Sequence, residues 1–213
     1  MSLVAINVLL DPDAATVAVA QAWNARLREQ DPLGFALDAD HSPHITLVQA
    51  FVRAADLDTV AGVLRDGLSV EPPPPCPSHA TGLYHLSDGT RGLMGLVIAP
   101  TDALRALQER LLSTLAPFTV PEGSSEAFAP RADGQPVSPP TLAYVREYAA
   151  TRTGAAYHPH LTLGIGPLEL VSRLEAEPFA PFPVRPVSIS LYQLGEYGVA
   201  QRKLHHLHTY QEP

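Results

Sequence analysis

The sequence is poor in cysteine and contains no long hydrophobic run. Cys76 is the one cysteine in 213 residues, so no disulfide bond can form within the chain, and the disulfide-stabilised class of secreted proteins is excluded. The apolar segment 3–10 has no basic residues before it and is followed by Asp11 and Asp13, which argues against a signal peptide or a membrane span. We therefore expect a buried strand at 3–10 and a cytoplasmic protein without membrane contact.

Positive charge is also scarce. The chain carries 14 basic residues against 22 acidic ones, a formal net charge of -8, and Lys203 is its one lysine. Because a protein that binds a long nucleic acid needs a basic surface, this balance argues against an extended nucleic-acid interface. It is compatible with a small anionic ligand held by a few groups. We expect the chain to act as a monomer.

The pattern of apolar residues predicts strands and helices in mixed order. The predicted strands cover 3–10, 44–51, 79–86, 91–98, 160–165, 184–194 and 202–210. The predicted helices cover 14–29, 54–68, 101–115, 141–150 and 168–176. The turn residues 87–90, Ser-Asp-Gly-Thr, favour a hairpin between two of the strands. Mixed strands and helices with hairpins predict an α+β fold.

The order strand, helix, strand, helix, strand occurs twice along the chain. This repetition predicts one bilobal domain over 1–213, with the approximate halves 1–90 and 91–213 as its lobes. Residues 117–140 are rich in proline, glycine and serine. A connection of this length is typical of a mobile surface loop or a functional lid.

One short segment carries the evidence for duplication. Pro43-His44-Ile45-Thr46-Leu47 and Pro159-His160-Leu161-Thr162-Leu163 match at every position except Ile for Leu. Alternate side chains of a strand share a face. The histidine and threonine of each copy should therefore lie on the same face of their strand. In the second copy Gly164 should share that face. The aliphatic residues, with Ile165 in the second copy, should face a core.

Two such polar faces meeting across a groove would suit chemistry at phosphorus. Imidazole is available in both protonation states near neutral pH, so His44 and His160 can divide the work of base and acid. The hydroxyls of Thr46 and Thr162 can donate hydrogen bonds to a phosphoryl oxygen. In-line displacement needs one proton removed and one delivered on opposite sides, and this set supplies both without a metal. We take His160 as base and His44 as acid, although the near-symmetry does not fix this assignment.

The paired motifs resemble the twin H-x-T-x signatures of the two-histidine (2H) phosphoesterase superfamily, which includes RNA 2′,3′-cyclic phosphodiesterases and 2′-5′ RNA ligase-like proteins. Phe51 after the first motif and Tyr157 before the second are similar to the family as well. The resemblance implies two pseudo-symmetric antiparallel sheets with outer helices around a central groove. It also implies hydrolysis of a 2′,3′-cyclic or 2′-5′ linked nucleotide or RNA end, with no metal or cofactor.

Carried onto this sequence, the resemblance makes His44 and His160 catalytic and makes Thr46 and Thr162 substrate-binding. Further substrate-binding candidates are two aromatic residues that could stack a base and two arginines that could neutralise a phosphate: Tyr157, Phe51, Arg91 and Arg152.

Two other functions fit the same residues. A protein with this groove could hold a nucleotide without turnover. Alternatively, four histidines near the motifs could ligate a metal: His41, His44, His158 and His160. Neither stretch carries a cysteine or carboxylate at a standard ligand spacing, which makes the metal hypothesis the weaker one.

Overall fold

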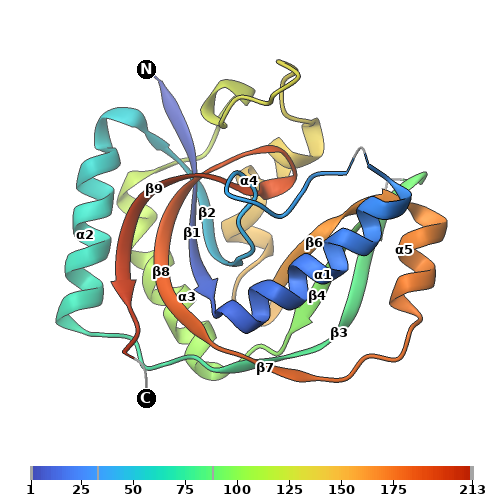
Figure 1. Cartoon of the computed structure of the whole chain (residues 1–213). Helices are drawn as coiled ribbons and strands as arrows, with labels where there is room; N and C mark the ends of the chain where they lie inside the picture. Colours follow the sequence, from blue (N-terminus) through green and yellow to red (C-terminus); the bar gives the residue numbers. More distant parts are fainter. Residues whose placement is uncertain (1, 33, 88, 212–213) are drawn as a thin grey trace.

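The computed structural model describes residues 2–32, 34–87 and 89–211. In this part of the chain two antiparallel sheets lie next to each other (Figure 1), one of five strands in the order β5-β2-β1-β8-β9 and one of four in the order β6-β4-β3-β7. The strands are β1 (Leu3–Pro12), β2 (Ile45–Arg53), β3 (Ser78–Ser87), β4 (Arg91–Ile98), β5 (Thr119–Val120), β6 (His160–Pro167), β7 (Phe182–Val184), β8 (Pro186–Leu194) and β9 (Ala200–Thr209). The predicted α+β class is confirmed.

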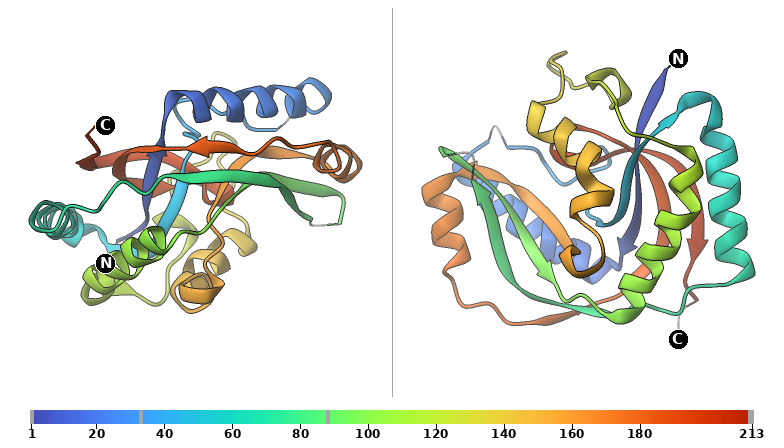
Figure 2. Two further views of the ribbon diagram at one scale, coloured as in Figure 1. Left: turned by 90° about the horizontal axis from the view of Figure 1, so that it is seen from below. Right: turned by 180° about the vertical axis from the view of Figure 1, so that it is seen from behind.

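The helices cover the outer faces of both sheets. They are α1 (Ala14–Gln30), α2 (Leu57–Val70), α3 (Asp102–Leu115), α4 (Pro139–Thr151) and α5 (Leu168–Glu175), with short 3₁₀ turns that include η5 (Glu196–Gly198). Helix α1 lies on one side of the sheets, and α3 and α4 lie on the other (Figure 2). Asp13 begins α1 by accepting a hydrogen bond from the amide of Thr16, as an N-cap aspartate does. In the described ranges, no helix has the length and apolar character needed to cross a membrane.

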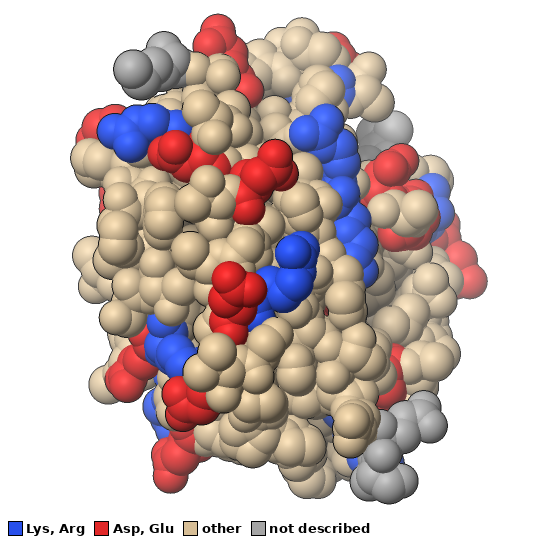
Figure 3. Space-filling view, turned by 90° about the vertical axis from the view of Figure 1, so that its left-hand side faces the viewer, with Lys and Arg blue, Asp and Glu red and all other residues tan. Residues whose placement is uncertain are grey.

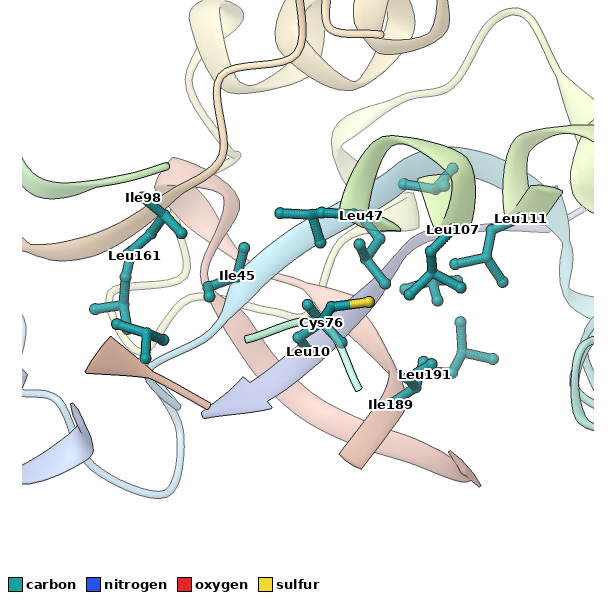
Figure 4. Close-up of a cluster of buried hydrophobic side chains, with 14 of the residues drawn as sticks. Leu10, Ile45, Leu47, Cys76, Ile98, Leu107, Leu111, Leu161, Ile189 and Leu191 are labelled. Carbon is teal, nitrogen blue, oxygen red and sulfur yellow. The ribbon is translucent and has the colours of Figure 1, made fainter. Parts of the chain in front are cut away.

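The two sheets share one hydrophobic core. Alternate residues of β1 face this core, and the aliphatic positions of both histidine motifs lie in it with at most 2% of their surface exposed. Figure 4 shows Ile45 of the five-stranded sheet beside Leu161 and Ile98 of the four-stranded sheet, and Cys76 next to Leu10. The aliphatic faces of both motif strands are therefore buried, as the alternation predicted, and they are buried in one shared core.

The charged side chains are scattered over the surface. Figure 3 shows one face of the molecule, most of which is uncharged; basic and acidic side chains are interspersed on it, and a narrow strip of basic side chains runs down its upper part.

The sheets do not follow the two halves of the sequence. The boundary near residue 90 falls inside the β3–β4 hairpin, whose strands pair from Ala80↔Ile98 to Ser87↔Gly92. The predicted hairpin is confirmed, and its hydrogen bonds join segments that the sequence assigned to different lobes. The first and last strands of the chain, in turn, belong to the five-stranded sheet, where β1 pairs with β8.

Helices also cross between the sheets. Helix α1 follows β1 of the five-stranded sheet but packs on β6, and α3 follows β4 of the four-stranded sheet but packs on β2. Each sheet therefore depends on residues from both halves of the chain. Both sheets thus contain strands from 1–90 and from 91–213.

Residues 117–140 pack along an edge of the five-stranded sheet. Strand β5 pairs with Phe51 and Val52 at the end of β2, and the buried Phe128 meets the ring of Phe51 edge to face at 5.8 Å. The side chain of Val137 is buried in the same small cluster. The segment is therefore a docked connection rather than a free loop.

Candidate active site

A cavity of about 460 Å³ lies where the two motif strands come together. His44 and Thr46 of the first motif and His160 and Thr162 of the second all line it. The remaining wall comes from β2, β3, β4, α4, η5 and the segment 152–159, and it is largely aromatic or aliphatic. It includes Gln49, Tyr84, Leu86, Leu93, Val97, Tyr144, Tyr148, Arg152, Tyr157 and Tyr197. The structure thus brings the two predicted pairs to one space.

Both motif strands carry a β-bulge at the same motif position. On β2, Val8 of the neighbouring strand pairs with Val48 and Leu9 pairs with Thr46, so Leu47 is left over. On β6, the neighbouring strand pairs with Gly164 and then with Thr162, so Leu163 is left over. A bulge bends the strand and re-aims its side chains. The same residue of each H-x-T-x copy therefore turns the strand at the cavity.

Side chains from the crossing helices satisfy the carbonyl groups at these bulges. Gln108 Nε2 of α3 donates to the Leu47 carbonyl at 3.0 Å, and Asn24 Nδ2 of α1 donates to the Leu163 carbonyl at 2.8 Å. Both amides are buried, so each supplies a hydrogen bond that water cannot reach the carbonyl to make. The duplicated motif thus has a duplicated support, one amide from each crossing helix.

The bulge also corrects one predicted orientation. Strict alternation placed Gly164 on the face of His160 and Thr162, but the extra residue shifts the pattern. A side chain at Gly164 would instead meet Asn24 Nδ2 at 2.9 Å and Leu27 at 3.0 Å, both on α1. With φ at 154°, this position favours glycine for its backbone as well as for the close approach of the helix.

Each catalytic candidate is held by the backbone two residues before it. His44 Nδ1 lies 2.7 Å from the Ser42 carbonyl, and His160 Nδ1 lies 2.9 Å from the His158 carbonyl. A carbonyl only accepts, so both Nδ1 atoms carry the proton and donate it. In the neutral ring this leaves Nε2 as the free acceptor for a ligand in the cavity. A proline separates each histidine from its acceptor and restricts the backbone there.

The surroundings disfavour charge on both imidazoles. Burial lowers the pKa of His44 to about 4, against a smaller opposing effect of its bond to the Ser42 carbonyl. Burial also lowers the pKa of His160, and the nearby charge of Arg152 acts in the same direction. In the unliganded protein at neutral pH both rings are therefore neutral.

The first threonine is oriented by a buried amide. Asn7 Nδ2, from the neighbouring strand β1, donates to Thr46 Oγ1 at 3.2 Å. Asn7 is fully buried and Thr46 is 7% exposed. Since the hydroxyl oxygen already accepts this bond, its own O–H is left to donate into the cavity. Thr162 lines the cavity from the more open side and is half-buried.

Aromatic side chains build the wall around the second histidine. The rings of Tyr84 and His160 meet edge to face, with centroids 5.6 Å apart. Glycine at position 95 makes this possible, because a Cβ there would lie 2.5 Å from the Tyr84 ring. The Arg152 guanidinium lies 4.9 Å from the centroid of the Tyr144 ring, a cation–π contact that holds a positive group at the cavity.

The other predicted binding residues divide into two groups. Tyr157 and Arg152 line the cavity, and the Tyr157 hydroxyl donates to the Thr46 carbonyl at 2.8 Å. Phe51 does not reach the cavity, because it points into the small cluster beneath residues 117–140. Arg91 is also outside the lining and forms an ion pair with the buried carboxylate of Asp31. We therefore withdraw Phe51 and Arg91 from the binding site.

Of the four histidines of the metal hypothesis, His44, His158 and His160 line the cavity and His41 does not. His41 stacks on Phe35 with ring centroids 5.2 Å apart and contacts Asp38 at 3.1 Å, outside the cavity lining. In the ranges that the structure describes, no group of three or more His, Cys, Asp or Glu side chains is placed to hold a metal ion.

Sequence reasoning missed the supporting amides. Asn7, Asn24 and Gln108 lie in elements predicted as strand and helix, at positions that read as ordinary polar residues in apolar surroundings. Their one signal is that a buried amide needs a partner, and the partner of each lies far along the chain, 39 to 139 residues away.

Several solved structures are similar to this chain. TT0787 of Thermus thermophilus is 12% identical over 96% of this chain and 97% of its own, with a TM-score of 0.57. Usb1 of Kluyveromyces marxianus is 12% identical over 97% and 98% of the two chains, with a TM-score of 0.47. E. coli LigT, crystallised with NADP+, is 14% identical over 99% and 100%, with a TM-score of 0.49. The likeness to TT0787 concerns the fold alone.

No curated protein matches the sequence. A family model does match the sequence, over residues 11–196. This range contains both histidine motifs and their supporting amides on α1 and α3. The family resemblance of the paired motifs is thereby confirmed, and the chain belongs to the 2′-5′ RNA ligase superfamily.

Proposed function

We propose that this protein is a phosphodiesterase that hydrolyses a 2′,3′-cyclic or 2′-5′ linked phosphodiester of a small nucleotide or RNA end. The observation that carries the proposal is the matched pair His44 and His160. Both donate Nδ1–H to a backbone carbonyl and both line one cavity, so two Nε2 atoms are left for one phosphate. The superfamily membership supports phosphoesterase chemistry in general.

In the proposed reaction one imidazole removes a proton from water as its oxygen attacks phosphorus. The bond to the leaving ribose oxygen breaks on the opposite side, and the other imidazole, protonated, gives that oxygen its proton. The threonine hydroxyls of Thr46 and Thr162 donate to the non-bridging oxygens. After one turnover the two histidines have exchanged protonation states, and proton exchange with solvent restores them.

The acid must gain its proton when substrate binds, because both rings are neutral beforehand. A phosphodiester anion between the rings favours one protonated imidazole. His160 is the more open to solvent of the two, whereas burial holds the pKa of His44 at about 4. We therefore assign His44 as the base and His160 as the acid, which reverses the assignment made from the sequence.

The direct test incubates the protein with each of the four nucleoside 2′,3′-cyclic phosphates and separates the products. We expect 2′- or 3′-monophosphate from the wild type, undiminished turnover in EDTA, and no product from the double variant H44A/H160A. Saturable binding without product would instead support a nucleotide-binding protein. Activity that EDTA abolishes and a metal ion restores would contradict the mechanism.

A further inference from the structure

Tyr197 combines a strained backbone with an open aromatic ring. Its φ and ψ are 60° and 15°, and no other non-glycine residue in 2–32, 34–87 and 89–211 has a positive φ. Left-handed backbone is unfavourable for a residue with a Cβ, and glycine is free of this strain. Yet the side chain is not buried in a core: 44% of the residue is exposed, and it lines the cavity. Core packing therefore does not explain why a bulky residue stands there.

A buried network holds this strained turn in place. Thr141 Oγ1 accepts from the Tyr197 amide at 3.1 Å and donates to Glu196 Oε1 at 2.7 Å. The Glu196 carboxylate, 7% exposed, also accepts from Ser138 at the start of α4 and from Arg131. All of these bonds act on the backbone and on the neighbouring residue. They fix where the Tyr197 ring stands without using the ring itself.

The Tyr197 ring has an aromatic partner outside the cavity that the residue lines. Phe35 stacks on Tyr197 with centroids 6.3 Å apart and planes inclined by 27°. Phe35 itself does not line the cavity, so it supports the ring from behind. The opposite sheet contributes the apolar side chains of Leu86, Leu93 and Val97 to the same cavity. A flat group entering there would have apolar or aromatic surface on both sides.

Beside this ring lies a buried polar atom that lacks a partner. Gln49 lines the cavity and is 4% exposed, and in the described structure its Oε1 accepts no hydrogen bond. Its amide lies near Gly198, the residue after Tyr197: a Cβ at that glycine would be 3.4 Å from Gln49 Nε2. A buried acceptor without a donor is unfavourable, so a ligand N–H or O–H is the natural partner.

We infer that Tyr197 and Gln49 form the subsite for the nucleobase of the substrate. The base stacks on the exposed face of Tyr197, and an N–H of its edge donates to Gln49 Oε1, while the phosphate lies between His44 and His160. The inference rests on the proposed function for the identity of the ligand. Tyr197 then acts in specificity and affinity, and takes no part in proton transfer.

Three variants at one position separate this role from a structural one. Tyr197→Gly removes the ring and relieves the backbone strain, whereas Tyr197→Phe keeps the ring. For a 2′,3′-cyclic nucleotide we expect Y197G to raise KM roughly tenfold, the scale of one base–aromatic stack, with a smaller effect on kcat. Its thermal unfolding midpoint should stay equal to the wild type or rise. Y197F should retain most of the affinity, and Y197A should lose both affinity and stability.

A substrate without a base provides the second arm. With glycerol 1,2-cyclic phosphate, which keeps the cyclic phosphate alone, Y197G should change KM far less than it does with the nucleotide. Gln49→Met, of similar size, should likewise raise KM only for the nucleotide. Equal KM changes for the two substrates, or a fall in the unfolding midpoint of Y197G, would show that Tyr197 has a structural role and would overturn the subsite.

The two proposals can fail separately. If the wild type turns over the cyclic nucleotide and Y197G leaves the KM ratio of the two substrates unaltered, the subsite is wrong and the proposed function stands. If the wild type turns over neither substrate, adenosine binding measured by calorimetry decides the subsite by itself. Weaker binding to Y197G than to Y197F would support it, and equal or absent binding would overturn it.

Discussion

The two histidine strands share their local geometry and differ in their surroundings. Both have a bulge after the threonine, a supporting amide from a crossing helix and an Nδ1 bond to the carbonyl two residues earlier. His44 and Thr46, however, are buried, and Asn7 donates to Thr46, whereas His160 and Thr162 are half-buried. A duplicated sequence thus builds the same geometry twice, and its two neighbourhoods expose the copies to solvent to different degrees. That difference supports the proposed division into a base, His44, and an acid, His160.

The largest effect should come from removing either imidazole. We expect H44A and H160A each to lower kcat/KM on a cyclic nucleotide roughly a thousandfold, since each removes one proton transfer. Bis(p-nitrophenyl) phosphate distinguishes the two histidines, because its leaving group departs as a phenolate and needs no proton from an acid. On this substrate the activity of H160A should be close to that of the wild type, and the activity of H44A should remain low. The opposite pattern would return the roles to the sequence-based assignment, and equal losses would remove the distinction.

The burial of His44 should appear in the pH dependence of stability. Below about pH 6.5 the unfolded chain takes up a proton that native His44 refuses, until the native group also protonates near pH 4. The free energy of unfolding should therefore fall by about 3 kcal/mol as the pH decreases over this range. His160 adds to the fall in the same direction.

Urea unfolding of the wild type and of H44Q across this pH range measures the His44 contribution. H44Q should reduce the dependence of the free energy of unfolding on pH. H79Q, which replaces an exposed histidine, serves as its control. A wild-type curve without slope between pH 6.5 and 4 would show that His44 titrates normally.

The two amides that support the bulges should each contribute to stability. Asn24→Leu leaves the buried Leu163 carbonyl without its side-chain donor, whereas Gln108→Met removes one of two donors to the Leu47 carbonyl, which also accepts from the Tyr148 hydroxyl at 3.1 Å. We expect Asn24→Leu to lower the free energy of unfolding by about 2 kcal/mol and Gln108→Met to lower it by less, and both to reduce kcat through the displaced histidine strand. Urea unfolding of these variants and of Gln21→Met, whose amide lies at the surface of α1, makes the comparison. A loss no larger than that of Q21M would show that the bulges need no such support.

The smallest effect should come from replacing Asn7, which contacts the threonine of the first motif. Asn7→Ala releases the Thr46 hydroxyl from its orienting bond, a contact that distinguishes the first motif from the second. We expect kcat to fall roughly tenfold, corresponding to one neutral hydrogen bond, with Thr46→Val losing at least as much. In the double variant N7A/T46V the two losses should not add, because both act through one hydroxyl. Additive losses would mean that Asn7 acts elsewhere.

Much of the site could be predicted because it is local. The strand period places histidine and threonine on one face and isoleucine or leucine on the other, and the structure confirms this for 44–47 and 160–163. Beyond Thr162 the prediction is wrong, because a bulge has no signal in residue alternation. Phe51 and Arg91 show the same limit: an aromatic ring or a guanidinium near a motif can serve a core or an ion pair equally well.

The sequence alone therefore determined which residues share a strand face and which chemistry they suit, since these follow from covalent order and side-chain type. Only the tertiary structure decided which sheet each strand joins, which helix crosses to support it and which histidine is buried. Those outcomes depend on contacts between residues far apart in the chain, such as Asn24 with Leu163 and Gln108 with Leu47. Burial and the pKa values that follow from it arise when such segments meet, and no single segment encodes them.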